Sequence, residues 1–314
     1  MLPELAVRTE NLTKRFERYL AVNQVDLAIA PGEVYGLIGP NGAGKTTLIR
    51  MLAMAEEPSL GEIYLNGDRL EPGKHNPILK RRLGYLPDDY PLYDDLTVWD
   101  YLDYFARLYQ LQGARRTQRL HEVLELVSLE HKRQSQIATL SRGMKQRLSL
   151  ARTIIHQPIL LLLDEPVSGL DPIARLEFRD IIKSVQAAGM TVLISSHILS
   201  DLAEMCTAIG IMELGCLVES APLQDLYQKL SQQQIWLSSL GDSKALVQFL
   251  TNYAQVEKLE LLPQGLRIDF SGDPEDAANL LKALIEQGFR ITEFHQTRED
   301  LETIFLKLGH RQAN

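Results

Sequence analysis

The stretch Gly39-Pro40-Asn41-Gly42-Ala43-Gly44-Lys45-Thr46-Thr47 decides the fold, because it fits the pattern G-x-x-x-x-G-K-[ST] of a phosphate-binding loop. It follows the apolar run 34–38, which predicts a buried strand, and it precedes a helical pattern over residues 48–53. The backbone N–H groups of such a loop point at phosphate oxygens, and the helix N-terminus adds its positive dipole. We therefore expect a nucleoside triphosphate here, with Lys45 at the β- and γ-phosphates and the Thr46 hydroxyl on Mg²⁺.

The composition sets the class of protein. With 314 residues, 45% of them hydrophobic and 24% charged, the chain is long enough for two soluble domains. A formal net charge of -8 argues against binding to nucleic acid, which calls for a basic surface. Cys206 and Cys216 lack metal-site spacing, so we expect packing thiols of a cytoplasmic protein. Because we find neither a signal peptide nor a run of apolar residues long enough to span a bilayer, any membrane role would come through a partner.

A pair of carboxylates follows a second predicted strand. The leucines of 160–163 indicate a fully buried strand, and Asp164 and Glu165 come directly after it. Two carboxylates at the end of a buried strand are costly unless a cation or ligand uses them; the alternative is an exposed pair that caps the next helix. A further strand over 191–194 ends before Ser195-Ser196-His197. Strands that alternate with helices predict a parallel sheet with ligands at the carboxyl ends of its strands.

The rest of the chain divides into three regions. Residues 5–30 predict two strands, over 5–7 and 24–30. Residues 90–135 predict a helical insertion, with one helix capped by Thr97 and Asp100 and ended by Gly113, and another over 118–127. A helix from Ser141 to about residue 156 follows. Beyond Pro222 we expect a small α+β domain that ends in a helix over 298–308 and carries no recognisable chemical motif.

These motifs, in this order, resemble those of the ATP-binding cassette (ABC) ATPase subunits, and the resemblance covers residues 5 to about 220. It implies an α/β fold: a P-loop NTPase (RecA-like) core with an antiparallel β subdomain and a helical insertion. The cassette would span residues 1–221, with its helical subdomain at about 90–156, and residues 222–314 would form the C-terminal α+β accessory domain.

The resemblance assigns roles to the residues after the strands. Asp164 would hold Mg²⁺ through water, Glu165 would orient or deprotonate the attacking water, and His197 would contact the γ-phosphate as the switch histidine. A lone histidine after a strand is more often structural, and its place beyond Ser195-Ser196 favours the functional interpretation.

The signature and the D-loop are the parts that imply a second subunit. Leu140-Ser141-Arg142-Gly143-Met144 is similar to the family signature Leu-Ser-Gly-Gly-Gln, with Arg142 and Met144 as departures. Ser141 and Gly143 would contact the γ-phosphate that a second subunit holds. The run Ser168-Gly169-Leu170-Asp171 matches the D-loop, which crosses the dimer interface in this family.

Two positions differ from the commonest family residue. Phe16 stands where an aromatic residue, more often tyrosine, stacks on adenine; Tyr19 is the alternative, and packing is a further interpretation for either. Asp88 stands where the Q-loop glutamine is usual, and it keeps an acceptor for water and Mg²⁺ but loses the amide donor.

The resemblance gives three sets of expected site residues. The expected catalytic residues are Lys45, Glu165 and His197, and the expected metal-binding residues are Thr46, Asp88 and Asp164. The expected nucleotide-binding residues are Phe16, Gly39, Pro40, Asn41, Gly42, Ala43, Gly44, Lys45, Thr46, Thr47, Ser141, Gly143 and Asp171.

The form of the Q-loop and of the signature is similar to that of exporter ATPases whose membrane subunits are separate chains. The resemblance therefore implies an ATPase that uses ATP and Mg²⁺ to power transport, as a homodimer or paired with a second ATPase subunit. It would bind an integral membrane subunit and no nucleic acid, and lie peripherally on the cytoplasmic face of the cell membrane. The aromatic cluster Tyr90, Tyr93, Trp99, Tyr101 and Tyr104 would line the groove for that subunit, unless most of it is core. The alternatives are a soluble ABC ATPase acting on the ribosome, DNA or cofactor assembly, and a non-catalytic regulator.

Overall fold

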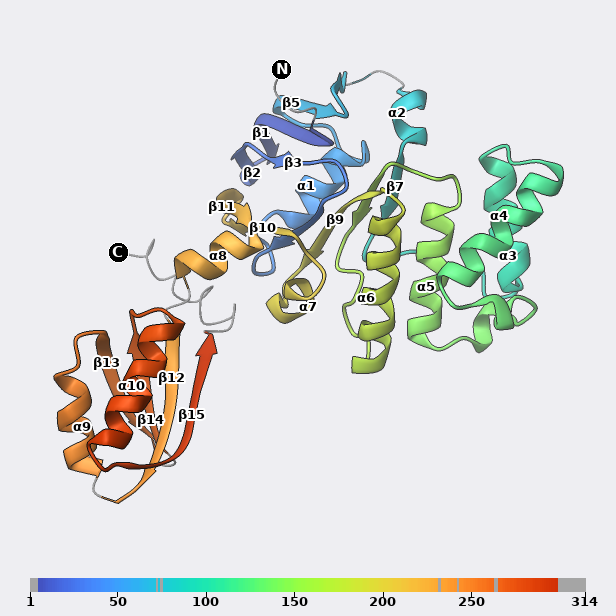
Figure 1. Cartoon of the computed structure of the whole chain (residues 1–314). Helices are drawn as coiled ribbons and strands as arrows, with labels where there is room; N and C mark the ends of the chain where they lie inside the picture. Colours follow the sequence, from blue (N-terminus) through green and yellow to red (C-terminus); the bar gives the residue numbers. More distant parts are fainter. Residues whose placement is uncertain are drawn as a thin grey trace. The chain divides into compact units, whose positions relative to one another are not determined.

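The computed structural model describes residues 5–71, 73, 76–230, 233–241, 243–262 and 265–298. The chain divides into two units, Met1–Leu223 and Gln224–Asn314 (Figure 1). The predicted domain boundary after residue 221 stays a proposal, as does the helical subdomain at about 90–156.

A six-stranded sheet is the centre of the first unit, with the strand order β11-β10-β4-β9-β8-β7. Every neighbouring pair from β10 to β7 is parallel, and only β11 runs antiparallel, against β10. The carboxyl ends of β4, β9, β8 and β7 therefore meet at one edge of the sheet, which is where ligands bind in such folds. The bounds are β4 Val34–Ile38, β7 Leu83–Leu86, β8 Leu160–Leu163, β9 Thr191–Ser196, β10 Ala208–Glu213 and β11 Cys216–Pro222.

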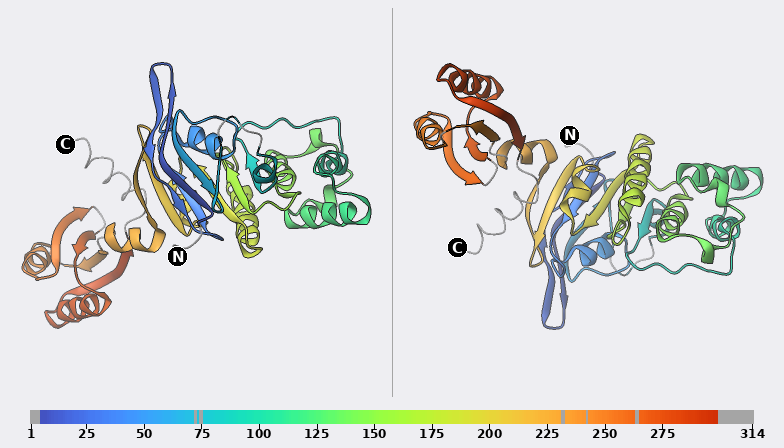
Figure 2. Two further views of the ribbon diagram at one scale, coloured as in Figure 1. Left: turned by 90° about the horizontal axis from the view of Figure 1, so that it is seen from above. Right: turned by 90° about the horizontal axis from the view of Figure 1, so that it is seen from below.

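A second, antiparallel sheet has the order β2-β1-β5-β6, with β3 paired to β1. Its strands are β1 Val7–Phe16, β2 Tyr19–Val25, β3 Ala28–Ile29, β5 Leu60–Leu65 and β6 Asp68–Arg69. The strand predicted over 5–7 is thus the start of a much longer one, and the strand predicted over 24–30 is divided between β2 and β3. The alternation of polar and apolar residues misleads here because the β1–β2 hairpin contains register shifts and extends into solvent (Figure 2).

The hydrophobic core lies around α1 (Lys45–Leu52), between the two sheets. Leu48, Ile49, Met51 and Leu52 are fully buried and pack with residues of β1, β4, β5, β8 and β9. Burying a side chain of this size contributes about 1.5–3 kcal/mol. The helix that carries Lys45 is therefore anchored in the hydrophobic core.

The remaining helices of this unit are α2 Pro77–Arg81, α3 Val98–Leu108, α4 Gly113–Leu126, α5 Arg142–Ile154, α6 Pro172–Ala187 and α7 Leu199–Ala203. The helix α8, Leu223–Leu230, begins at the last residue of this unit and otherwise belongs to the second. Short 3₁₀ turns cover Glu130–Lys132 and Ile137–Thr139. Thr97 caps α3 by accepting the N–H of Asp100, as predicted. Gly113, however, begins α4 instead of ending α3: its φ of 53° fits a turn, and the preceding helix has already ended at Leu108.

In its described residues, the second unit consists of α8 followed by a four-stranded antiparallel sheet with two helices. Its elements are β12 Gln233–Leu240, α9 Ser243–Thr251, β13 Val256–Leu262, β14 Gly265–Phe270, α10 Pro274–Glu286 and β15 Arg290–Arg298. The strand order β13-β14-β12-β15 makes it a split β-α-β arrangement. Both helices pack on one face of the sheet, where Leu246, Leu280 and Leu284 meet Ile235 and Ile268. Apart from position 298, the helix predicted over 298–308 lies outside the described residues.

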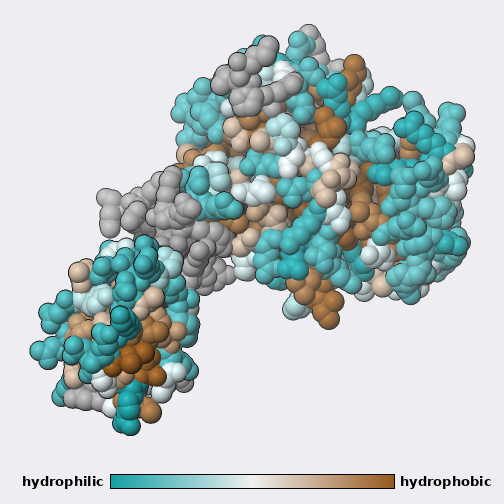
Figure 3. Space-filling model, in the orientation of Figure 1, coloured by the Kyte–Doolittle hydropathy of each residue, from teal (hydrophilic) through white to brown (hydrophobic). Residues whose placement is uncertain are grey.

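The surfaces of both units that Figure 3 shows are mostly hydrophilic, with hydrophobic residues in separate patches. Within the described part of the chain, no helix combines the length and the apolar character that crossing a bilayer requires.

Candidate functional site

The predicted phosphate loop joins β4 to α1 as the sequence indicates. Gly44, with φ of 103°, is the N-cap of α1, and a Cβ there would lie 2.3 Å from the carbonyl oxygen of Ala21. A Cβ on Gly39 would lie 2.3 Å from the carbonyl oxygen of Met212. The loop is therefore held between the start of β2 and the end of β10, and both glycines are required by close backbone contact.

Lys45 lies inside the loop, with only 5% of its surface exposed. Its Nζ donates to the carbonyl oxygen of Gly39 at 2.7 Å and lies 3.4 Å from Oε1 of Glu165. A weaker contact at 3.3 Å reaches the carbonyl oxygen of Pro40. The ammonium group is thus buried among oxygen atoms at the place where the loop motif puts phosphate.

Asp164 comes directly after β8 and is 1% exposed. Its Oδ1 accepts a hydrogen bond from the Thr46 hydroxyl at 3.1 Å and another from the Ser195 hydroxyl at 2.7 Å. Burial raises the pKa of the Asp164 carboxyl, and these two hydrogen bonds lower it. A buried carboxylate beside a hydroxyl is a set of hard oxygen donors, so Thr46 and Asp164 fit Mg²⁺.

Glu165 has a left-handed backbone, with φ of 48°, which is unusual for a residue other than glycine. Its N–H donates to the Ser195 hydroxyl at 2.9 Å, which holds the backbone in place. Its Oε2 lies 2.8 Å from Nδ1 of His197, while Oε1 faces Lys45. A carboxylate held between an ammonium and an imidazole group is suited to orient water and take a proton from it.

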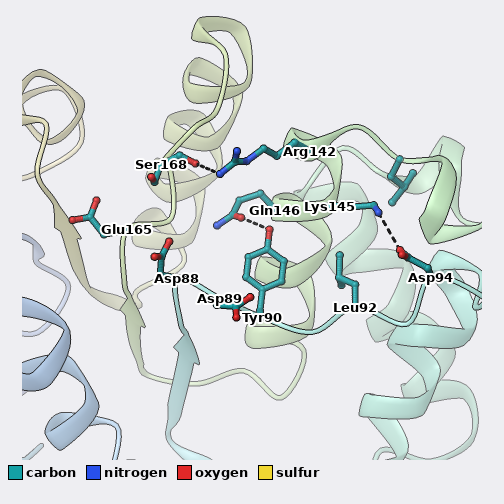
Figure 4. A pocket seen from close by; sticks show the side chains of 11 residues that line it. Asp88, Asp89, Tyr90, Leu92, Asp94, Arg142, Lys145, Gln146, Glu165 and Ser168 are labelled. Atoms are coloured by element: carbon teal, nitrogen blue, oxygen red, sulfur yellow. Dashed lines mark hydrogen bonds and ion pairs between the residues drawn. The ribbon is translucent and has the colours of Figure 1, made fainter.

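Asp88 follows β7 and lines a pocket of about 520 Å³ together with Tyr90, Arg142, Glu165 and other residues (Figure 4). Burial raises the pKa of the Asp88 carboxyl, and the negative charge of Glu165 raises it further, while the charge of Arg142 lowers it. Asp88 therefore lies within electrostatic range of the predicted catalytic carboxylate. Its role as a metal ligand stays a prediction.

The signature and D-loop residues are placed at the starts of two helices. Ser141 is the N-cap of α5, where its Oγ accepts the N–H of Met144, and Asp171 is the N-cap of α6, where it accepts the N–H of Ala174. Ser141 and Asp171 are exposed, whereas Gly143 is buried. Within the described residues, no hydrogen bond or ion pair joins them to the phosphate loop of the same chain.

The two candidate adenine-stacking residues differ in their contacts. Phe16 is 42% exposed, and its ring has Nζ of Lys14 at 4.8 Å from the ring centre. Tyr19 is 55% exposed, but its hydroxyl donates to the carbonyl oxygen of Gly42 at 2.9 Å. Tyr19 is thus tied to the phosphate loop, whereas Phe16 lies at the exposed end of the hairpin.

Two parts of the site were not predicted. Ser195 touches both carboxylate residues, yet the sequence draws attention only to His197 at the end of β9. The β10–β11 turn packs on the phosphate loop through the N–H of Gly215, which donates to the carbonyl oxygen of Ala43 at 3.0 Å. For Ser195, the one local signal in the sequence is its position two residues before His197.

Comparison with known proteins gives a consistent result. A family model described as "ABC transporter" matches residues 22–168. The chain is 32% identical to the bacitracin transport ATP-binding protein BcrA of Enterococcus faecalis, over 98% of this chain and 97% of that protein. It is 30% identical to the linearmycin resistance ATP-binding protein LnrL of Bacillus subtilis, over 97% and 98%. A solved ATP-binding subunit of an ABC transporter is 31% identical, with a TM-score of 0.63 over 71% of this chain and 92% of that one. The predicted fold is confirmed.

Proposed function

The chain belongs to the ABC transporter ATP-binding proteins, and we propose that it hydrolyses ATP with Mg²⁺ at a site completed by a second ATPase subunit, to drive export through a separate membrane subunit. The proposal of ATP hydrolysis rests on the position of Glu165, whose two carboxylate oxygens face Lys45 and His197.

Each of these residues has a task that follows from its position. Lys45, at the base of the loop, binds the phosphate oxygens at the end of the triphosphate. Glu165 orients the attacking water and takes its proton, and His197 holds Glu165 and contacts the γ-phosphate. Mg²⁺, held through Thr46 and Asp164, supplies positive charge to the phosphates when it is bound.

A second copy of the chain, or a second ATPase subunit, would complete the site. Supporting this, Ser141 and Asp171 are exposed, and in the part of the chain that the structure describes no hydrogen bond or ion pair joins them to the phosphate loop of their own chain. Ser141 stands at the N-terminus of α5, where backbone N–H groups and the helix dipole favour an anion. We infer a two-fold arrangement in which the Ser141 of each chain faces the γ-phosphate bound by the other.

The names of two relatives, for bacitracin transport and linearmycin resistance, support the proposed membrane partner and the proposed direction of transport. A role in export from the cytoplasmic face of the membrane fits both names. The aromatic cluster only partly supports a docking groove: Tyr101 is fully buried core, whereas Tyr93 and Tyr104 are 47% and 49% exposed. Nothing in the comparisons favours the alternative of a soluble ABC ATPase with a non-transport target.

Steady-state hydrolysis of ATP by the purified chain tests the catalytic assignment. Glu165→Gln should lower kcat by about 10²–10⁴-fold, because general-base catalysis contributes that much, while ATP still binds. Glu122→Gln, at an exposed position on α4, is the control and should hydrolyse ATP like the wild type. Near-normal turnover by Glu165→Gln would remove Glu165 as the catalytic residue.

A further inference from the structure

Arg142 joins two segments that the proposed function places at the partner's nucleotide. It is the first residue of α5, directly after Ser141, and its side chain extends to the loop before α6 (Figure 4). There its Nη2 donates to the carbonyl oxygen of Ser168 at 3.0 Å. A charged donor and a carbonyl acceptor form one of the stronger kinds of hydrogen bond.

The guanidinium group also fills the space beside Gly169. A Cβ on Gly169 would lie 2.5 Å from Nη2 and 2.6 Å from Cζ of Arg142. The φ of Gly169 is +67°, a value that residues with a side chain rarely adopt. Position 169 is therefore glycine because of its backbone conformation, and the missing side chain also leaves the space that the guanidinium group of Arg142 fills.

A close contact between helix starts strengthens this junction. A Cβ on Gly143 would lie 2.8 Å from Cβ of Ala174, so the first turn of α5 packs directly on the first turn of α6. The segment with Ser141 and the loop 168–171, which ends at Asp171, are thus held together by packing and by one charged side chain. The family signature has glycine at the position of Arg142, and glycine has no side chain with which to make this bond.

We propose that Arg142 is a positioning residue that clamps the first turn of α5 to the loop 168–171, so that Ser141 and Asp171 meet the second subunit as one unit. The clamp rests on the proposed function, because it acts on a site that two chains share. The contacts of Arg142 lie within its own chain. Its effect is on the hydrolysis of the nucleotide that the second subunit binds.

A double-mutant cycle on the full-length chain tests the clamp. Arg142→Gly should lower kcat for ATP hydrolysis about tenfold, which corresponds to the loss of one charge-assisted hydrogen bond, and should change KM less than twofold. Gly169→Ala forces the guanidinium away and also strains its own backbone at φ +67°, so it should lower kcat at least as much as Arg142→Gly. When the guanidinium is absent, only that backbone strain remains, so Gly169→Ala should lower kcat by a smaller factor in the Arg142→Gly background than in the wild type. Arg142→Lys should recover part of the rate, since it keeps one charged donor.

The control is Arg133→Ala, which removes an arginine that is paired with Glu130 and half exposed. It should leave kcat and KM at the wild-type values. Multiplicative losses in the double variant would overturn the clamp, and so would a wild-type kcat for Arg142→Gly. A fall in melting temperature with parallel changes in kcat and KM would also overturn it, because that result indicates a merely structural role. Absence of hydrolysis by the wild-type chain would overturn the proposed function itself, together with the clamp.

Discussion

Replacing Ser195 should disturb the positions of the Asp164 and Glu165 carboxylates but leave the binding of the triphosphate nearly unchanged. The Ser195 hydroxyl is fully buried, donates to Asp164 at 2.7 Å and accepts the N–H of Glu165 at 2.9 Å. Ser195→Ala would leave that N–H without a partner and take one donor from Asp164. An unpaired buried polar group costs about 1–3 kcal/mol.

Part of this cost should appear in catalysis, because the backbone of Glu165 is in the left-handed region and would relax without the hydrogen bond. If Ser195→Ala removes about 1.4–2.7 kcal/mol of transition-state stabilisation, kcat falls about 10–100-fold. Among the described residues, the hydrogen bonds of the Ser195 hydroxyl go to Asp164 and Glu165 and none goes to the phosphate loop, so KM for ATP should change little. Steady-state kinetics over a range of Mg²⁺ and ATP concentrations measures both quantities.

Ser196→Ala is the matched control, since Ser196 lies on the same strand, is 1% exposed and has a hydroxyl that accepts the N–H of Ile198 at 3.0 Å. It removes a buried hydroxyl of the same strand without touching either carboxylate residue. If Ser195→Ala and Ser196→Ala have the same kcat, the positioning argument for Ser195 is refuted.

Three further predictions concern the loop, the hairpin and a partly buried histidine. Gly39→Ala should abolish ATP binding and lower the melting temperature, because its Cβ would lie 2.3 Å from a main-chain oxygen; unchanged binding in a fluorescence titration would contradict this. Phe16→Ala should weaken ATP binding about tenfold, since stacking on a base is worth about 1–3 kcal/mol, and Tyr19→Phe should weaken it less; the reverse order would make Tyr19 the stacking residue. Burial lowers the pKa of His156 below its ordinary value, so its contribution to stability is present above about pH 6.5 and lost as the pH falls. The melting temperature should therefore decrease more between pH 7.5 and 5.5 in the wild type than in His156→Gln, and equal slopes would contradict that assignment.

That the main candidate residues lie close together could be predicted, because parallel strands end at one edge of their sheet. The phosphate loop, Asp164-Glu165 and His197 each follow an apolar run that is short and uninterrupted, and β4, β8 and β9 lie side by side. Only the order of these strands had to come from the structure.

Other features are set by contacts between distant parts of the chain, which no local pattern contains. The strands β10 and β11 were not predicted, although β10 supplies the Met212 oxygen that packs on the phosphate loop. The contact between Arg142 and Gly169 joins residues that are neighbours only after α5 and α6 pack together. Likewise, β1 was predicted too short because its polar half forms an exposed hairpin.

The central claim is that one chain holds the nucleotide and another completes the site. It is tested by mixing two variants, Lys45→Ala and Ser141→Ala, each expected to be at least about 100-fold impaired alone because an essential phosphate contact is lost. In an equimolar mixture, half of the dimers would contain one chain of each kind, and each of these has one intact composite site. We expect the mixture to hydrolyse ATP at about a quarter of the wild-type rate per chain. A rate no higher than the average of the two variants measured separately would contradict a site shared between two chains.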